Sequence, residues 1–278
     1  MSNTNAKSLV IAALVLVNVF FLTIIVSETV GVARYERREI ENICAVVRNN
    51  GIAIDTENVS VGGVFSTMRT VRVSDRELAI ARAVLGDAEM TDQGVIVLYE
   101  NAERGAAEFY SGCDFKISVN DGVVSGSNGA ARVAGKLLRD MKLDTSEVFV
   151  SGETGNETVT AVSAYKGVSI FNCTIEFDFS GGYLRTVTGR YVAGVEAVGG
   201  GLKISSVGTA LMAFVSAVNR GDIECGRIIS VEPGYIQNVV GAFGDGAITP
   251  AWSIITDEAR YVIDDTDGEI RQLTFFST

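Results

Sequence analysis

The longest apolar run of the chain lies near its start. It extends over Leu9–Val26, 18 residues without a charge, with Asn18 as one of its two polar interruptions. A helix of this length rises about 27 Å, close to the hydrocarbon thickness of a bilayer, about 30 Å. Lys7 precedes the run and Glu28 follows it. The pattern predicts residues 1–27 to be a short cytoplasmic start and a transmembrane helix.

Two features leave alternatives open at this segment. Gly31 and Ala33 are small residues suited to a signal-peptidase site, although the apolar run exceeds the usual length of a cleaved signal. Three arginines within twelve residues after the span favour a cytoplasmic C-terminal side, but large domains are often translocated regardless of charge. The Asn18 amide is either a partner contact to another transmembrane helix or a single tolerated polar residue.

Four later segments have apolar residues at helical spacing. A helix is expected over Tyr35–Asn50, a second from Ser74 to about Leu85, a third around Val133–Met141 and a fourth over Ser206–Asn219. Ser74 followed by Glu77 has the spacing of a capping box, and a glycine follows the second helix.

Between these helices the pattern changes to the alternation typical of half-buried strands. The clearest example is Val168–Phe179, in which Phe171, Cys173, Ile175 and Phe177 share one face. The other expected strands are 64–73, 94–99, 108–119, 158–165, 183–192, 227–231, 235–240, 252–256, 260–264 and 269–275.

The order of these elements is a helix followed by consecutive antiparallel strands, repeated two or three times. Residues 126–193 and 205–278 read as two copies of one such unit. We therefore expect an α+β fold: an N-terminal transmembrane helix, then tandem modules of a helix packed on a curled antiparallel sheet. The expected boundaries are 28–123 for an N-terminal exported α+β domain and 124–278 for a C-terminal α+β domain.

Composition narrows the possible functions. The chain has 278 residues, with 34 Asp and Glu against 23 Lys and Arg and no His, so its net charge is −11. This balance argues against nucleic-acid binding. The absence of His removes serine-protease triads and His-zinc sites.

No other residue pattern indicates catalysis. The four cysteines, Cys44, Cys113, Cys173 and Cys225, are too far apart for a Cys-x-x-Cys motif, and sequence leaves open whether any form a disulfide. The acidic groups at Asp264–Asp267 and at Glu176 with Asp178 lack an EF-hand pattern and read as solvated turn and strand faces. We expect no catalytic residue, no metal site and no cofactor.

Three stretches resemble the YycI/YycH family and the related PepSY-like modules. They are the apolar span SLVIAALVLVNVFFLTIIV around Asn18, the segment Glu39–Ile54 ending in RNNGIAI, and the closing stretch TPAWSI with YVIDDTDGE. The last contains the family-like positions Pro250, Trp252, Tyr261, Asp264 and Gly268. The aromatic residues on its alternating strands are expected to have a structural role.

The resemblance implies a non-enzymatic regulator of the WalK-type sensor histidine kinase of low-GC Gram-positive bacteria. Members of this family have one helix in the cell membrane, a cytoplasmic N-terminus and an extracytoplasmic body, and act through protein contacts. The implied partners are a sensor histidine kinase and a second YycH-like accessory protein. Four cysteines are unusual for an exported protein of that group.

Two other functions fit the same sequence. One is a cell-surface module that binds wall polymer or peptide along a sheet edge. The other is a PepSY-like regulator or inhibitor of a peptidase. An extracellular soluble piece binding a ligand without a kinase would favour the first, and inhibition of a protease by that piece would favour the second.

Overall fold

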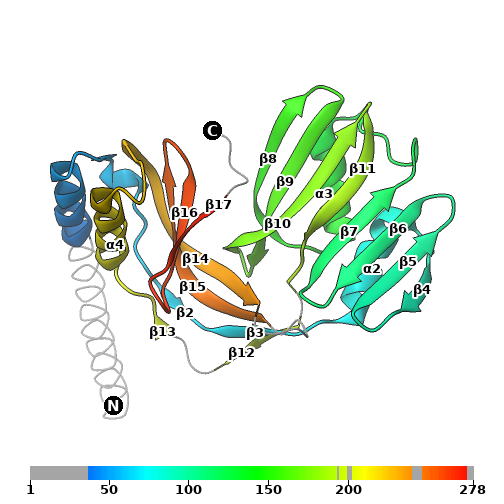
Figure 1. The fold of residues 1–278 in the computed structure, drawn as a ribbon, viewed down its shortest axis with the longest axis horizontal. Helices are drawn as coiled ribbons and strands as arrows, with labels where there is room; N and C mark the ends of the chain where they lie inside the picture. The colour runs from blue at the N-terminus through cyan, green and yellow to red at the C-terminus, as the bar shows by residue number, and fades with distance from the viewer. Residues whose placement is uncertain (1–36, 193, 199–201, 240–245, 274–278) are drawn as a thin grey trace, which may run out of the picture.

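The computed structural model describes residues 37–192, 194–198, 202–239 and 246–273 (Figure 1). The expected span Leu9–Val26, including Asn18, lies outside these ranges. Within them, every helix is too short or too polar to cross a bilayer.

The described chain is an α+β fold in which one order of elements, a helix followed by four antiparallel strands, occurs three times. The first unit consists of α2 (Ser74–Leu85), β4 (Glu89–Asp92), β5 (Ile96–Asn101), β6 (Gly105–Tyr110) and β7 (Asp114–Val119). The second consists of α3 (Ala130–Asp140), β8 (Thr145–Glu153), β9 (Asn156–Tyr165), β10 (Val168–Ser180) and β11 (Tyr183–Arg190). The third consists of α4 (Val207–Arg220), β14 (Arg227–Val239), β15 (Gly246–Thr256), β16 (Arg260–Asp264) and β17 (Ile270–Leu273).

Shorter elements complete the fold. A helix over 37–49 precedes the first unit, and the remaining elements are β1 (Ala53–Ile54), the 3-10 helix η1 (Thr56–Asn58), β2 (Val64–Phe65), β3 (Met68–Thr70), β12 (Val195–Ala197) and β13 (Leu202–Lys203). The sequence therefore contains one more repeat than the two copies expected at 126–193 and 205–278.

The first and second units form one lobe. Their last strands, β7 and β11, pair antiparallel, which gives the strand order β4-β5-β6-β7-β11-β10-β9-β8. The order reads the same from either edge, so the two units are related by an approximate two-fold axis at the β7–β11 seam. Helices α2 and α3 contact each other on one face of this sheet (Figure 1). Ile80, Leu138 and Val187 belong to the single core beneath them.

The third unit forms the other lobe together with the N-terminal elements. Helix 37–49 buries Ile40, Cys44 and Val47 in the same core as Phe214 of α4 and Trp252 of β15. Strand β1 adds parallel to β14, and β3 pairs with β15. These additions explain why segments about 175 residues apart in sequence share one sheet.

Strand β10 belongs to both lobes. Its C-terminal half pairs with β9 and β11, while Ile170 near its start pairs in parallel with Tyr235 of β14. Next to that pair, the Asn172 side chain accepts from the Gln237 backbone N–H and donates to its carbonyl, each at 2.8 Å. Where β10 and β14 separate, the Asn172 side chain thus makes the two hydrogen bonds that a backbone amide group would otherwise make.

The domain boundary expected between residues 123 and 124 falls inside the first lobe. Core residues of that lobe come from both sides of it, for example Phe115 and Leu138. The second core likewise combines residues from Ile40 to Met68 with Ile170, Cys173 of β10 and residues after Ile204. The core distribution describes an outer lobe, 37–70 with 195–273, into which the 74–190 lobe is inserted.

Four expected strands differ in the structure. The strand expected over 64–73 is the two short strands β2 and β3. The strand expected over Glu108–Val119 is a hairpin, β6 and β7, because Cys113 adopts φ +63 and its N–H donates to the Tyr110 carbonyl at 3.1 Å. The strands expected at 227–231 and 235–240 are the single strand β14. Pro233 has no N–H to donate, and β14 tolerates it at this position. On this side of β14, Val231 pairs with Val59 and Tyr235 pairs with Ile170 of β10, and Pro233 lies between these two pairs, where no backbone donor is required.

The capping box expected at Ser74 and Glu77 is also wrong, although α2 has the expected bounds. Val73 is the residue before the helix, no side chain caps it, and the Val73 carbonyl accepts from the N–H groups of Arg76 and Glu77. Glu77 is instead fully buried in the first turn of α2, as described below.

Candidate functional site

The family-like residues of the closing segment lie in the third unit. Pro250 and Trp252 are on β15, Tyr261 and Asp264 are on β16, and Gly268 is in the turn to β17. The Pro250 carbonyl accepts from the Asp265 N–H at 3.0 Å, and the Gly268 N–H donates to the Asp264 carbonyl at 2.8 Å. Pro250, Asp264 and Gly268 are thus brought together at one end of the β16–β17 hairpin.

The two aromatic residues of this group point into the core beneath α4. Trp252 is fully buried, and its indole N–H donates to the Ser205 carbonyl at 3.2 Å. Tyr261 packs edge-on against Phe214 with ring centroids 5.4 Å apart. Their positions match those of packing residues.

The Asp264 carboxylate accepts hydrogen bonds from neighbouring residues of the chain. Asn238 Nδ2 donates to it at 2.9 Å and the Thr266 N–H at 2.9 Å. Asn238 in turn accepts from Arg271 at 2.8 Å. In the described part of the chain, neither this group nor any other set of three Asp, Glu or Cys side chains is placed to hold a metal ion.

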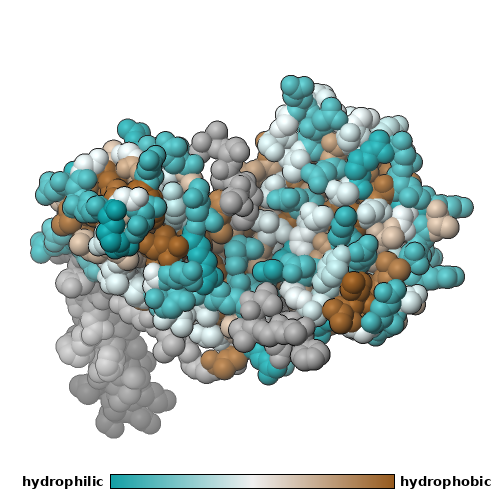
Figure 2. Space-filling view, in the orientation of Figure 1, coloured by the Kyte–Doolittle hydropathy of each residue, from teal (hydrophilic) through white to brown (hydrophobic). Residues whose placement is uncertain are grey.

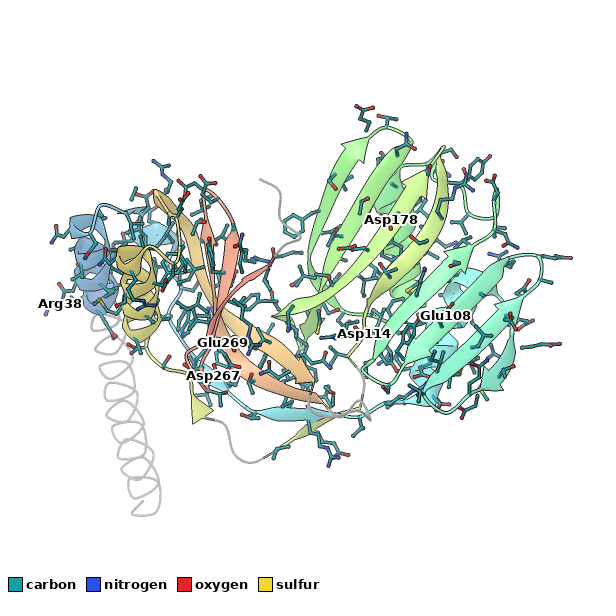
Figure 3. The ribbon with its side chains drawn as sticks, in the orientation of Figure 1. Arg38, Glu108, Asp114, Asp178, Asp267 and Glu269 are labelled. Carbon is teal, nitrogen blue, oxygen red and sulfur yellow. The ribbon has the colours of Figure 1, made fainter. Side chains whose placement is uncertain are left out.

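The acidic pair expected on the strand face lies on the open face of the first lobe, opposite α2 and α3. Asp178 accepts from the Thr158 hydroxyl at 2.9 Å and from the Thr186 hydroxyl at 2.8 Å. Figure 3 shows Asp178 and Glu108 on this same face. Burial, followed by the charge of Asp178, raises the pKa of Glu176. These contacts are those of a structured polar surface.

The four cysteines are free thiols. Cys44, Cys113 and Cys173 are buried and Cys225 is half-buried. Burial raises the pKa of the Cys173 thiol to about 12, and Cys173 donates to Gln237 Oε1 at 2.9 Å. A thiol this basic and enclosed is a packing group with a structural hydrogen bond, because the thiolate is the reactive form.

A buried carboxylate connects the segments that join the lobes. Glu77 in the first turn of α2 has no exposed surface, and it accepts from the Arg72 guanidinium and from the Tyr191 hydroxyl, the latter at 2.7 Å. Arg72 follows β3 and Tyr191 follows β11, so each lies on one of the two chain crossings. Burial, the neighbouring Cys113 and the bond to Glu77 raise the pKa of Tyr191. The sequence pattern does not indicate this site. Glu77 follows Ser74 by three residues, which is the spacing of a capping box, and the glutamate of a capping box is ordinarily exposed.

A second polar contact crosses between the lobes at the first strand of the second unit. Arg260 on β16 is 1% exposed, and its Nη2 donates to both Glu147 carboxylate oxygens, at 2.9 and 3.0 Å. The Arg260 guanidinium also lies over the Phe171 ring, 5.6 Å from its centroid. The partners Arg260 and Glu147 are 113 residues apart in sequence, so no local pattern predicts this pair.

Strand β8, which carries Glu147, is an edge of the first lobe. Among the described strands it pairs with β9 alone. Val148 and Val150 lie opposite the core residues Ala161 and Val159, yet they are 48% and 52% exposed. Their side chains therefore extend the apolar face of the sheet beyond the part that α3 covers.

The other edge of the same sheet has a different character. Strand β4 is short and carries Glu89 and Asp92, charges of the kind that prevent edge-to-edge pairing. Strand β8 has nine residues, and its centre carries valines. Strand β8 is therefore the longer of the two edges and the one with two exposed valines on a single face.

Comparison with known proteins finds weak similarity to solved structures. No family model matches the chain, and no curated protein matches it. The structure is similar to that of an uncharacterized protein from Eubacterium rectale, at 12% identity and a TM-score of 0.48, covering 78% of this chain and 89% of that one. It is also similar to the YpeB C-terminal domain of Bacillus megaterium, at 12% identity and a TM-score of 0.35, covering 74% and 99%.

Proposed function

We propose that this protein is a membrane-anchored, extracytoplasmic regulator that contacts a two-component sensor histidine kinase and performs no chemistry itself. The observation that supports this proposal is the exposed apolar edge of β8, where Val148 and Val150 remain half-exposed. A partner strand or loop added to β8 would satisfy its outer backbone groups and cover both valines.

Strand β8 is also connected to the other lobe, so a partner bound there could influence both lobes. Glu147, next to Val148, holds Arg260 of the other lobe. A partner that binds β8 would therefore act beside the lobe junction. If it bound one arrangement of the lobes better than another, a differential affinity worth about 1–3 kcal/mol would be enough for regulation.

The predicted transmembrane helix would be joined to the body of the protein through the outer lobe. The predicted span ends at Val26, and helix 37–49 packs in the same core as α4. Asn18 would pair with a polar group of a kinase transmembrane helix. The Asn18→Leu variant should then weaken co-purification with the kinase, and unchanged recovery would remove Asn18 from the proposal.

The contact at β8 is tested by co-purification of the full-length protein with the kinase from detergent-solubilised membranes. We expect Val150→Lys to reduce recovery of the kinase about tenfold, the loss typical of a residue at the centre of an interface. Val95→Lys is the matched control, because Val95 is 66% exposed in the first unit, away from β8. Equal recovery with both variants would contradict a kinase contact at β8.

A cell-surface module for wall polymer is the second candidate, supported by the polar open face around Asp178 and Glu108 (Figure 3). It predicts that the full-length protein sediments with purified wall material without a kinase. It also predicts that Val150→Lys leaves this sedimentation unchanged, because Val150 lies on the opposite face of the sheet from Asp178.

A further inference from the structure

The seam between the first and second units shows how two of these units associate. Their last strands pair antiparallel, from Asp114 opposite Arg190 to Ser118 opposite Thr186. Across the seam α2 contacts α3, and one continuous core forms below both helices. An ion pair between Arg190 and Asp114, at 2.8 Å, closes one end of the seam. Association therefore uses two surfaces at once: the last strand and the flank of the helix beside it.

The third unit has both surfaces. Helix 37–49 lies beside α4 at Gly208 and Asn219, but among the described elements the other flank of α4, which faces β17, has no helix on it, and the outer side of β17 has no strand. The last strand of the unit, β17, pairs with β16 alone. Beside it a groove of about 480 Å³ separates α4 from the β16–β17 hairpin. Ala213, Ser216 and Arg220 line the groove from α4, and Ile270 and Gln272 line it from β17.

The shape and chemistry of the groove suit a helix and a strand. Ala213 and Ser216 are small, so a second helix can approach α4 closely at this flank. Tyr261 forms part of the floor and is itself packed against Phe214. The surface around α4 is a mixture of hydrophilic and hydrophobic residues (Figure 2), and Arg220, Asp222 and Gln272 make the groove lining partly polar. In the first lobe the corresponding flank of α2 is covered by α3.

We infer that the β17 edge and the α4 groove bind the same surface of a second copy of this chain. In the resulting two-fold dimer the two β17 strands pair antiparallel and the two α4 helices lie side by side across the axis, as β7–β11 and α2–α3 do within one chain. Two-fold association of identical surfaces is the commonest form of homodimer. This inference is independent of the kinase and of β8.

Sedimentation velocity of the full-length protein in detergent, over a range of concentrations, tests the inference. We expect a dimer for the native chain and at least about a tenfold higher dissociation constant for Ile270→Lys and for Ser216→Arg. Ile229→Lys is the matched control, because Ile229 is a 43% exposed residue on β14 and does not line the groove. A native chain that is monomeric, or a dimer that Ile270→Lys leaves intact, would overturn the inference.

Cross-linking gives a second measurement that does not require a disruptive substitution. Opposed residues of paired antiparallel strands have Cα atoms about 4.5–5.5 Å apart, which a disulfide can span. In a Cys225→Ser background, one of Ile270→Cys, Arg271→Cys and Gln272→Cys should give a covalent dimer under mild oxidation, while Ile229→Cys should not. Absence of a covalent dimer from all three would contradict pairing through β17.

Discussion

Tyr191 donates its hydroxyl hydrogen to the Glu77 carboxylate at 2.7 Å, and this bond connects the end of the inserted lobe to the start of its first helix. Arg72 binds the same carboxylate through Nε and, at 3.2 Å, through Nη2. Arg72 and Tyr191 lie on the two segments that connect the lobes. The buried Glu77 carboxylate therefore holds both connecting segments in place. A rigid junction is what a protein needs if it transmits contact at one lobe to the other.

Removal of that anion should be strongly destabilising. Glu77→Ala leaves the Arg72 guanidinium and the buried Tyr191 hydroxyl without their acceptor, so we expect the free energy of unfolding to fall by about 3–5 kcal/mol. Urea denaturation measures this loss. Glu41→Ala is the control, since Glu41 pairs with Arg37 at an exposed site and should change stability by less than about 1 kcal/mol. Equal effects of the two variants would show that Glu77 has no special role.

The buried Cys173 thiol predicts a dependence of stability on alkaline pH. Its pKa is raised by burial from 9.0 to about 12. Between these values the folded chain retains a proton that the unfolded chain releases, so this contribution is complete below pH 9 and is lost as pH rises toward 12. The loss is about 1.4 kcal/mol per pH unit at most.

Cys173→Ser separates this effect from the tyrosines that also titrate there. Serine keeps a donor for Gln237 but has no titration in this range. Denaturation curves at pH 8 to 11 should show a shallower decline in stability for Cys173→Ser than for the native chain. Parallel declines would mean that the Cys173 thiol does not contribute.

Gly194 and Gly268 allow a matched test of the lobe junction. Both have positive φ, +57 and +72. A Cβ on Gly194 would lie 2.7 Å from the Val71 carbonyl oxygen, whereas one on Gly268 would meet no atom within 4 Å. Gly268→Ala should therefore lose about 1 kcal/mol of stability from backbone strain alone, and Gly194→Ala clearly more. Thermal denaturation compares them, and an equal loss would contradict close packing of the crossings.

Sequence alone predicts the elements whose burial is periodic. The bounds of α2 and the position of α4 follow from their apolar stripes, and Gly86 occupies the C-terminal cap expected for α2. The alternation of β10 is equally clear in its second half, where Ile175, Phe177 and Phe179 are buried in one core.

The rest could not be predicted because its signal is not local. Strands β4 and β8 are largely exposed, so they lack the alternation that marks a half-buried strand. Glu77 has the spacing of a cap, and only the fold brings Tyr191 to it, 114 residues later. The candidate interface at β8 follows from the exposure of Val148 and Val150 at a sheet edge, which requires the strand order.

The proposed orientation has a direct test in cells. If the body lies outside the membrane, protease added to cells stripped of their wall but with intact membranes should cleave residues after 37 and leave a small membrane-bound fragment. A cytoplasmic kinase domain in the same cells should stay intact, which controls for lysis. Protection of the body until the membrane is broken would exclude an outward-facing regulator.

Contact between β8 and the kinase is the central claim, and photo-crosslinking in native membranes measures it most directly. A photoreactive amino acid replaces Val150 in one variant and Val95 in another, both exposed valines of the same lobe. We predict that position 150 yields a covalent adduct containing the sensor kinase and that position 95 yields none. An adduct of equal intensity from both positions, or none from position 150 while the kinase is present, would contradict the account.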